Sequence, residues 1–269
     1  MSWWGKFAGG GIGFALGGPL GAMIGTILGH QLDKPTAKQR GRMGFDPGSQ
    51  ERTQAAFFAA TFSVMGHVAK ADGQVSREEI QLAKQVMTQM NLNADQRKAA
   101  IDLFNQGKQA DFALDEVLEQ FRKECRRKIT LLQMFIEIQL QAAYADGTKD
   151  PAEDRILKHI CAKLGYPLAL LTQIESLIFA QQNHQYADTT RVSSQAALEN
   201  AYKILGTNSK ASEAEIKKAY RRLMSQHHPD KLIAKGLPEE MLKIATDKAQ
   251  EIQKAYSLIK EHRKSNTQH

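Results

Sequence analysis

Apolar residues recur along most of this chain at intervals of three and four, the spacing of one face of an α-helix. In residues 51–186, alanine, leucine and isoleucine mix with glutamine and charged residues at this period. Two further apolar stripes follow near the C-terminus. Runs of alternating β-branched residues are scarce, so the sequence predicts an all-α protein without a sheet.

The N-terminal stretch has a different pattern, because no charged residue occurs from Phe7 to Gly29. At about 1.5 Å per residue, this run is long enough to cross a hydrocarbon core of roughly 30 Å. We therefore predict a transmembrane helix over 7–31, after a short N-terminus of residues 1–6. Glycines in line along one face let two helices approach closely, which predicts a parallel homodimer. Glycine recurs at every fourth position: Gly9, Gly13, Gly17, Gly21, Gly25 and Gly29.

Two other interpretations of this segment are a flexible glycine-rich tail and a cleaved secretory signal peptide. A signal peptide has a more basic start and a small-residue cleavage site, whereas this run ends in a polar sequence, residues 29–33. Positive charge also predicts orientation, because lysine and arginine accumulate on the cytoplasmic side. Only Lys6 and the α-amino group precede the helix, so we expect a periplasmic N-terminus and a cytoplasmic C-terminal bulk. Four basic residues follow closely: Lys34, Lys38, Arg40 and Arg42.

A weak internal repeat lies in the central region, where residues 69–73 and 143–147 both read Ala-x-Ala-Asp-Gly. A helix start follows each copy. Ser76 with Glu79 forms one capping pattern, and the second comprises Asp150, Pro151 and Glu153. The repeat predicts two helix–turn–helix halves.

Metal sites are not predicted in this region. Placing Asp72 at the fifth position of a calcium-binding loop puts Val68 and Lys70 where the first and third ligands belong. The cysteines, Cys125 and Cys161, are too few for a structural zinc site. In a cytoplasmic domain we expect both to be reduced.

The C-terminal region predicts a helical hairpin. Ser212 and Glu215 form a capping box before a helix with an apolar stripe of Ile216, Tyr220 and Leu223. Pro229 ends that helix, and a second helix is expected to open at residues 238–240. Basic residues fall on other faces of the first helix: Lys217, Lys218, Arg221 and Arg222. The stretch His228, Pro229, Asp230 and Lys231 follows, with the aspartate predicted on a loop beside the basic face.

This hairpin, with a short helix that stops at Gly206, resembles a DnaJ-type J-domain. The resemblance rests on four motifs in order, residues 201–206, 215–223, 227–231 and 253–256. The central region resembles a TerB-like helical domain through its two Ala-x-Ala-Asp-Gly turns. The whole chain is similar to the DnaJ-like membrane co-chaperones that combine these parts. The implied boundaries are an anchor at 7–31, a linker at 32–50, a TerB-like domain at 51–186, a linker at 187–196 and a J-domain at 197–269.

The resemblance implies a bacterial inner-membrane protein whose J-domain binds a DnaK-type chaperone and stimulates its ATPase. It also implies links to envelope-stress signalling and to capsule polysaccharide synthesis of the colanic acid type. The residues expected to bind the chaperone are His228, Pro229, Asp230, Lys217, Lys218, Arg221, Arg222 and Lys231. No catalytic residue, cofactor or metal is predicted, because no nucleophile or second acid accompanies the tripeptide. The sequence does not identify a client.

Charge separates this protein from nucleic-acid-binding classes. The net charge is +7, with five basic and two acidic residues before position 51, and fourteen basic and nine acidic residues after position 192. The excess is therefore split between two regions instead of forming one stripe. Two alternative functions stay open on the sequence: a membrane scaffold or sensor acting through the central domain, and a glycine-zipper protein that perforates bilayers.

Overall fold

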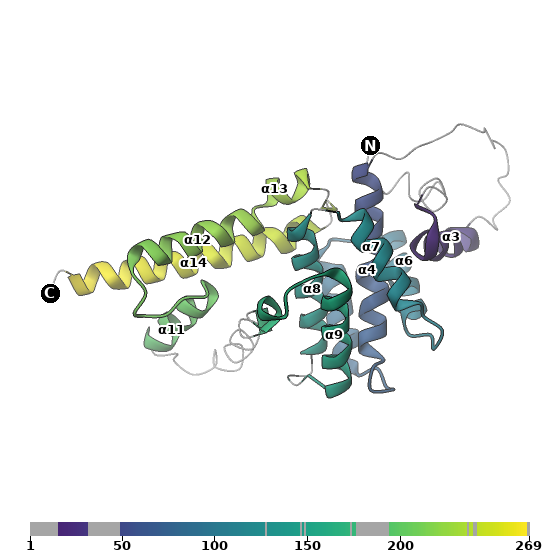
Figure 1. Ribbon diagram of the computed structural model, residues 1–269, viewed down its shortest axis with the longest axis horizontal. Coiled ribbons are helices and arrows are strands. Elements are labelled where there is room, and N and C mark those ends of the chain that lie inside the picture. The colour runs from purple at the N-terminus through teal and green to yellow at the C-terminus, as the bar shows by residue number, and fades with distance from the viewer. Residues whose placement is uncertain are drawn as a thin grey trace. The chain divides into compact units, whose positions relative to one another are not determined.

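The structure is a computed structural model that describes residues 16–31, 49–126, 128–145, 147, 149–172, 174–175, 194–235, 237–238 and 241–267 (Figure 1). The chain divides into two compact units. The first comprises residues 1–166 together with 235–241, and the second comprises 167–234 and 242–269. Every regular element in the described ranges is a helix, which confirms the all-α prediction there.

In the first unit, helices pack around α4 (Ser49–Ala69), which is buried over most of its length (Figure 1). Phe57 of α4 contacts the rings of Phe121 and Phe135 at centroid distances of 5.8 and 6.5 Å. Phe121 and Phe135 lie 4.6 Å apart, so three helices share one aromatic core. The surrounding helices are α5 (Arg77–Gln89), α6 (Ala94–Gly107), α7 (Leu114–Glu124), α8 (Ile129–Ala143) and α9 (Pro151–Leu164).

The two predicted helix–turn–helix halves are present as α4–α5 and α8–α9. Ser76 caps α5 and Asp150 caps α9, and each forms a reciprocal capping box with the glutamate three residues later. Gly73 and Gly147 have φ values of +95° and +94°, a region that favours glycine. The second turn is described only in part, because Asp146 lies outside the described residues.

The predicted continuous helix over 7–31 is interrupted. Gly17 and Gly18 have φ values of +57° and +60°, and α3 (Gly18–Gln31) begins at this break. Leu20 and Ile24 are buried in the first unit. Gln120 of α7 accepts the Leu20 N–H at 2.9 Å and donates from Nε2 to the Gly17 carbonyl oxygen at 2.7 Å. The physical reason for the correction is the left-handed backbone of two successive glycines, which an α-helix does not contain.

None of the described helices combines the length and apolar character needed to cross a membrane. The predicted dimer glycines Gly9 and Gly13 lie outside the described residues, as does most of the predicted linkers, 32–50 and 187–196.

The second unit is built on α12 (Glu213–His227) and α14 (Leu242–Thr267), which lie side by side (Figure 1). Helix α11 (Ser194–Ile204) packs against α14, and Gly206 closes it with a φ of +64°. Helix α14 begins at Leu242, and residues 239 and 240 of its predicted opening at 238–240 lie outside the described residues. The Pro238 carbonyl oxygen accepts the Met241 N–H at 3.0 Å just before this helix.

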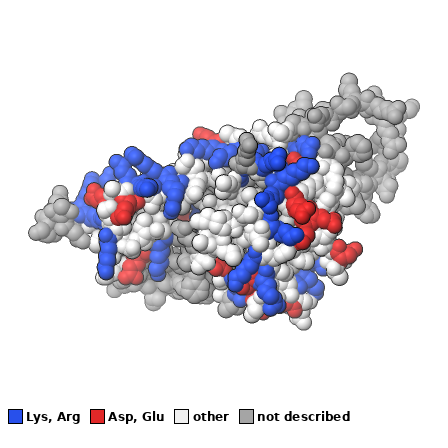
Figure 2. Space-filling view, viewed as in Figure 1, with Lys and Arg blue, Asp and Glu red and all other residues white. Residues whose placement is uncertain are grey.

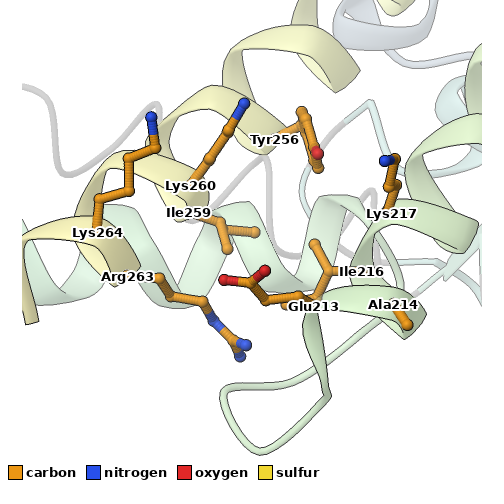
Figure 3. A pocket seen from close by; sticks show the side chains of 9 residues that line it. All are labelled: Glu213, Ala214, Ile216, Lys217, Tyr256, Ile259, Lys260, Arg263 and Lys264. Atoms are coloured by element: carbon orange, nitrogen blue, oxygen red, sulfur yellow. The ribbon is translucent and has the colours of Figure 1, made fainter. Parts of the chain in front are cut away.

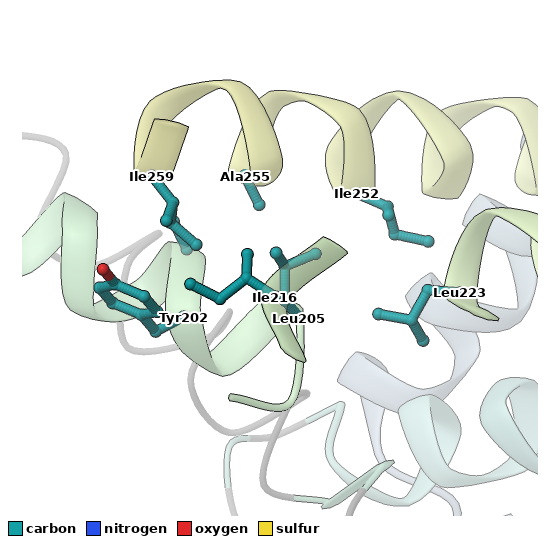
Figure 4. Packing of buried hydrophobic residues seen from close by; sticks show 8 residues of the cluster. Tyr202, Leu205, Ile216, Leu223, Ile252, Ala255 and Ile259 are labelled. Atoms are coloured by element: carbon teal, nitrogen blue, oxygen red, sulfur yellow. The ribbon is translucent and has the colours of Figure 1, made fainter. Parts of the chain in front are cut away.

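The core of this unit comes from all three helices (Figure 4). Tyr220 and Tyr256 stack with ring centroids 4.2 Å apart, which joins the α12 and α14 faces beside that core. Arg263 donates from Nε to the Tyr202 hydroxyl at 2.9 Å, and this bond joins the distal part of α14 to α11. The buried set is Ala201, Tyr202, Leu205, Ile216, Leu223, Ile252, Ala255 and Ile259.

Candidate partner-docking surface on the C-terminal hairpin

The local sequence fixes where α12 begins and ends. Ser212 Oγ accepts the Glu215 N–H at 3.3 Å, and Glu215 Oε2 accepts the Ser212 N–H at 2.7 Å. The backbone bond from Ser212 lowers the pKa of the Glu215 carboxyl, because it favours the charged form. At the other end, His228 adopts an extended ψ of 123° before Pro229, as the proline demands.

One face of α12 is buried and another is charged. Ile216, Ala219, Leu223 and His227 are buried toward α14 and its neighbours. The predicted basic residues all lie on exposed positions, and they make no ion pair within the part of the chain that the structure describes. Lys and Arg side chains are numerous around α12 and α14 in Figure 2. The basic strip is Lys217, Lys218, Arg221 and Arg222.

The tripeptide lies at the end of this basic strip. Pro229 opens a short helix, α13 (Pro229–Ala234), so Asp230 lies in a helical first turn. This corrects the predicted loop, and the reason is that Pro229 has the backbone angle of a first helical residue and needs no N–H donor. Asp230 is exposed and makes no hydrogen bond or ion pair among the described residues.

Two residues missed by the sequence prediction hold the tripeptide in place. Lys231 Nζ donates to Ser225 Oγ at 2.8 Å, which ties α13 to the last turn of α12. Ser225 follows Arg221 and Arg222 by four and three residues and so continues their face of the helix. Leu232 is 1% exposed and anchors α13 in the interior. The apolar Leu232, three residues after Pro229, was the only sequence signal for this anchor.

His228 is partly buried, whereas Asp230 is exposed. Its Nδ1 atom is buried and has no hydrogen-bond partner in the protein. A buried polar atom without a partner costs free energy. The surface therefore combines an exposed carboxylate, four unpaired cations and an imidazole with one unused nitrogen.

The described residues contain no group of three or more histidine, cysteine, aspartate or glutamate residues placed to hold a metal ion. Cys125 and Cys161 are buried thiols, and burial raises the pKa of Cys125. The arrangement is suited to binding a protein partner through charge-assisted hydrogen bonds.

Comparison with known families assigns each part of the chain. The DnaJ domain model matches residues 200–267, the tellurite resistance protein TerB model matches 58–175, and the co-chaperone DjlA transmembrane domain model matches 1–50. Together they define a non-enzymatic co-chaperone with a membrane-anchoring N-terminal domain, a central TerB domain and a C-terminal J-domain. A J-domain implies a DnaK-type chaperone as partner.

Curated relatives share this organisation over nearly their full length. The co-chaperone protein DjlA of Coxiella burnetii is 47% identical over 267 residues, which cover 98% of this chain and 99% of the relative. The DjlA proteins of Vibrio cholerae and Salmonella paratyphi A are 43% and 42% identical to it. Each match covers 98% of this chain and 99% of the relative. The chain belongs to the DjlA co-chaperone family. No solved structure matches it significantly.

Proposed function

We propose that this protein docks a DnaK-type chaperone on the α12–α13 surface and stimulates hydrolysis of the ATP bound to that chaperone. The observation that carries the proposal is the exposed, unpaired Asp230 at the end of four unpaired cations on α12. The protein itself supplies no catalytic group. Its contribution is to hold the chaperone in the conformation that hydrolyses ATP.

The two parts of the surface act at different stages of binding. The basic strip attracts an acidic surface and raises the association rate, an effect that weakens as salt increases. Asp230 then accepts a bidentate hydrogen bond from an arginine of the chaperone, which fixes the geometry of the complex.

Charge reversal on the basic strip tests this function. The full chain in detergent micelles is titrated into a DnaK-type chaperone preloaded with ATP, and the single-turnover hydrolysis rate is measured. We expect Arg221→Glu/Arg222→Glu to raise the half-saturating concentration by about tenfold or more, since each lost cation near an acidic surface contributes about 1 kcal/mol. Raising the salt concentration should reduce the difference in half-saturating concentration between this variant and wild type.

Lys243→Glu/Lys254→Glu is the matched control, because it reverses two exposed lysines of α14 outside the strip. It should leave the half-saturating concentration nearly unchanged. An equal loss in both variants would assign the effect to net charge alone. A full chain that gives no stimulation at any concentration would contradict the proposed function itself.

We further propose the inner-membrane placement and the homodimer predicted from the sequence. The basic residues after position 33 support a periplasmic N-terminus and cytoplasmic TerB and J-domains. The glycine repeat supports a dimer at Gly25, because this residue is exposed and a Cβ added there meets nothing within 4 Å in this chain. The links to envelope stress and capsule synthesis stay predictions.

A further inference from the structure

A second concave site lies in the J-domain, where the first turn of α12 meets the last turns of α14 (Figure 3). Its volume is about 340 Å³, near the lower limit of roughly 300 Å³ for small-molecule sites. The residues that line it are Glu213, Ala214, Ile216, Lys217, Tyr256, Ile259, Lys260, Arg263 and Lys264. We call this site the distal groove.

The distal groove has an apolar floor and a cationic rim. Ile216 and Ile259 form the buried floor, at 3% and 1% exposure. Figure 3 shows charged side chains around these two isoleucines. The rim lysines are exposed and make no ion pair or hydrogen bond within the described ranges, and these are Lys217, Lys260 and Lys264.

The remaining charged groups of the lining do not cancel this charge. Arg263 is held in place by bonds of 2.9 Å to the Tyr202 hydroxyl and 2.9 Å to the Ser209 carbonyl oxygen. These two bonds hold its guanidinium group beside the groove. Glu213 is the single carboxylate of the lining, against four cations. Among the described residues, the three exposed lysines make no ion pair, so the groove carries an excess of positive charge.

We infer that the distal groove binds the headgroup of an anionic phospholipid in the membrane to which the chain is anchored. Unpaired ammonium groups attract a phosphate, and the apolar floor accepts the glycerol and upper acyl carbons beside it. The compact volume suits a headgroup better than an extended acidic peptide. The N-terminal transmembrane domain keeps this unit near a lipid surface.

Lipid in the distal groove leaves the chaperone-docking turn accessible. Glu213 and His227 are the two ends of α12, and fourteen residues at about 1.5 Å each separate them by about 20 Å. Lys217 borders both surfaces, whereas Lys260 and Lys264 belong to the groove alone. A groove seated on headgroups thus directs the tripeptide toward the aqueous phase, where a soluble chaperone approaches.

Fluorescence quenching in nanodiscs tests the inference on the full chain. A dye is attached at Ser265→Cys, next to Lys264, and the native thiols Cys125 and Cys161 are buried away from the label. Nanodiscs contain phosphatidylcholine with or without phosphatidylglycerol, plus a lipid with a quenching headgroup. Phosphatidylglycerol should increase quenching, and Lys260→Glu/Lys264→Glu should require about tenfold or more phosphatidylglycerol for the same quenching, since each cation contributes about fivefold.

Two controls decide the source of the effect. Lys243→Glu/Lys254→Glu should retain the wild-type quenching, and an equal loss in this variant would overturn the groove by showing that only total charge matters. Competition identifies the ligand: soluble glycerophosphoglycerol should relieve quenching, whereas relief only by a polyglutamate peptide would overturn the lipid in favour of an acidic peptide. Quenching that is independent of phosphatidylglycerol would also overturn the lipid-binding inference.

In lipid-free micelles, Lys260→Glu/Lys264→Glu should stimulate the chaperone as wild type does. This measurement separates the test of lipid binding from the test of the proposed function.

Discussion

At the scale of single residues, Gly66 and Gly107 determine how closely α4 and α6 cross. A Cβ built at Gly66 would lie 2.0 Å from the Phe104 carbonyl oxygen, and one at Gly107 would lie 1.7 Å from the Ser63 carbonyl oxygen. Each glycine therefore contacts the backbone of the opposite helix, which cannot move aside as a side chain does. The two helices approach so closely because neither has a side chain at the crossing.

Gly107→Ala should destabilise the central domain by about 1–3 kcal/mol or more, because the methyl group forces the helices apart. The measurement is urea unfolding of the full chain in detergent, followed by circular dichroism. Asn105→Ala is the control on the same helix, at an exposed position, and it should change stability by less than about 0.5 kcal/mol. Equal stability of Gly107→Ala and wild type would show that the helices do not cross at this distance.

His67, next to this crossing, makes stability depend on pH. Burial lowers the pKa of its imidazole below 6.5, and a bond to the Gly107 backbone opposes the shift only in part. The unfolded chain thus binds the proton more readily, so stability is greatest above pH 6.5 and decreases as pH falls toward the folded-state pKa. His67→Asn should reduce the slope of the urea midpoint between pH 7.5 and 5.5, whereas exposed His262→Asn should not. An unchanged slope in His67→Asn would rule out this residue as the cause.

At the scale of elements, reciprocal caps fix where the helices begin. At the start of α12, the side chains of Ser212 and Glu215 each accept the backbone N–H of the other residue. These N–H groups have no carbonyl partner within the helix. This start sets the rotation of the helix and therefore the face on which the basic strip lies. The cap therefore positions the residues of α12 that contribute to the docking surface and to the distal groove.

Ser212→Ala should destabilise the first turn of α12 by about 1 kcal/mol, because the Glu215 N–H loses its acceptor. Hydrogen exchange of the full chain should show faster exchange over residues 213–216 and unchanged exchange in α9. Ser212→Thr keeps the hydroxyl and should restore most of the protection. Faster exchange across the whole hairpin would mean that the cap supports the entire unit instead of one turn.

The sequence predicted elements well wherever a local rule governs them. The boxes at Ser76, Asp150 and Ser212 place their helix starts correctly, because capping depends on residues only three apart. The same rule applies to Asn93 with Gln96, a start that we did not predict although the signal is present. The proposed docking residues were predicted through their motif, since it is contiguous in sequence.

The prediction failed where a residue's surroundings decide the outcome. Proline after His228 suggested a loop, but Leu232 packs inside and turns the segment into α13. The break at Gly17 and Gly18 depends on Gln120, which is about 100 residues away and invisible to a local pattern. The distal groove also joins residues far apart in sequence, so no motif marks it.

At the scale of the whole molecule, the family comparison defines three parts: a membrane-anchoring domain, a TerB domain and a J-domain. Anchoring restricts the J-domain to a thin layer near the membrane and raises its local concentration there. The proposed dimer would place two docking surfaces side by side. Substitutions in the glycine repeat test whether this dimer forms.

Gly25→Leu should weaken self-association of the full chain in membranes. A Cβ at position 25 meets nothing within 4 Å in its own chain, so the leucine side chain would clash with a second helix packed against this residue. The signal of a membrane two-hybrid assay should decrease severalfold. Retention of the full signal by Gly25→Leu would refute a dimer through this part of the repeat.

The most direct test of the central claim is the single-turnover ATPase rate of a DnaK-type chaperone with the full chain and with Asp230→Asn. We predict a loss of stimulation of about 30-fold or more, since removing one partner of a charge-assisted pair at an interface costs roughly 2–5 kcal/mol. Asp247→Asn, an exposed carboxylate of α14, should stimulate as wild type does. Equal stimulation by Asp230→Asn and wild type would contradict the assignment of the α12–α13 surface as the chaperone-docking site.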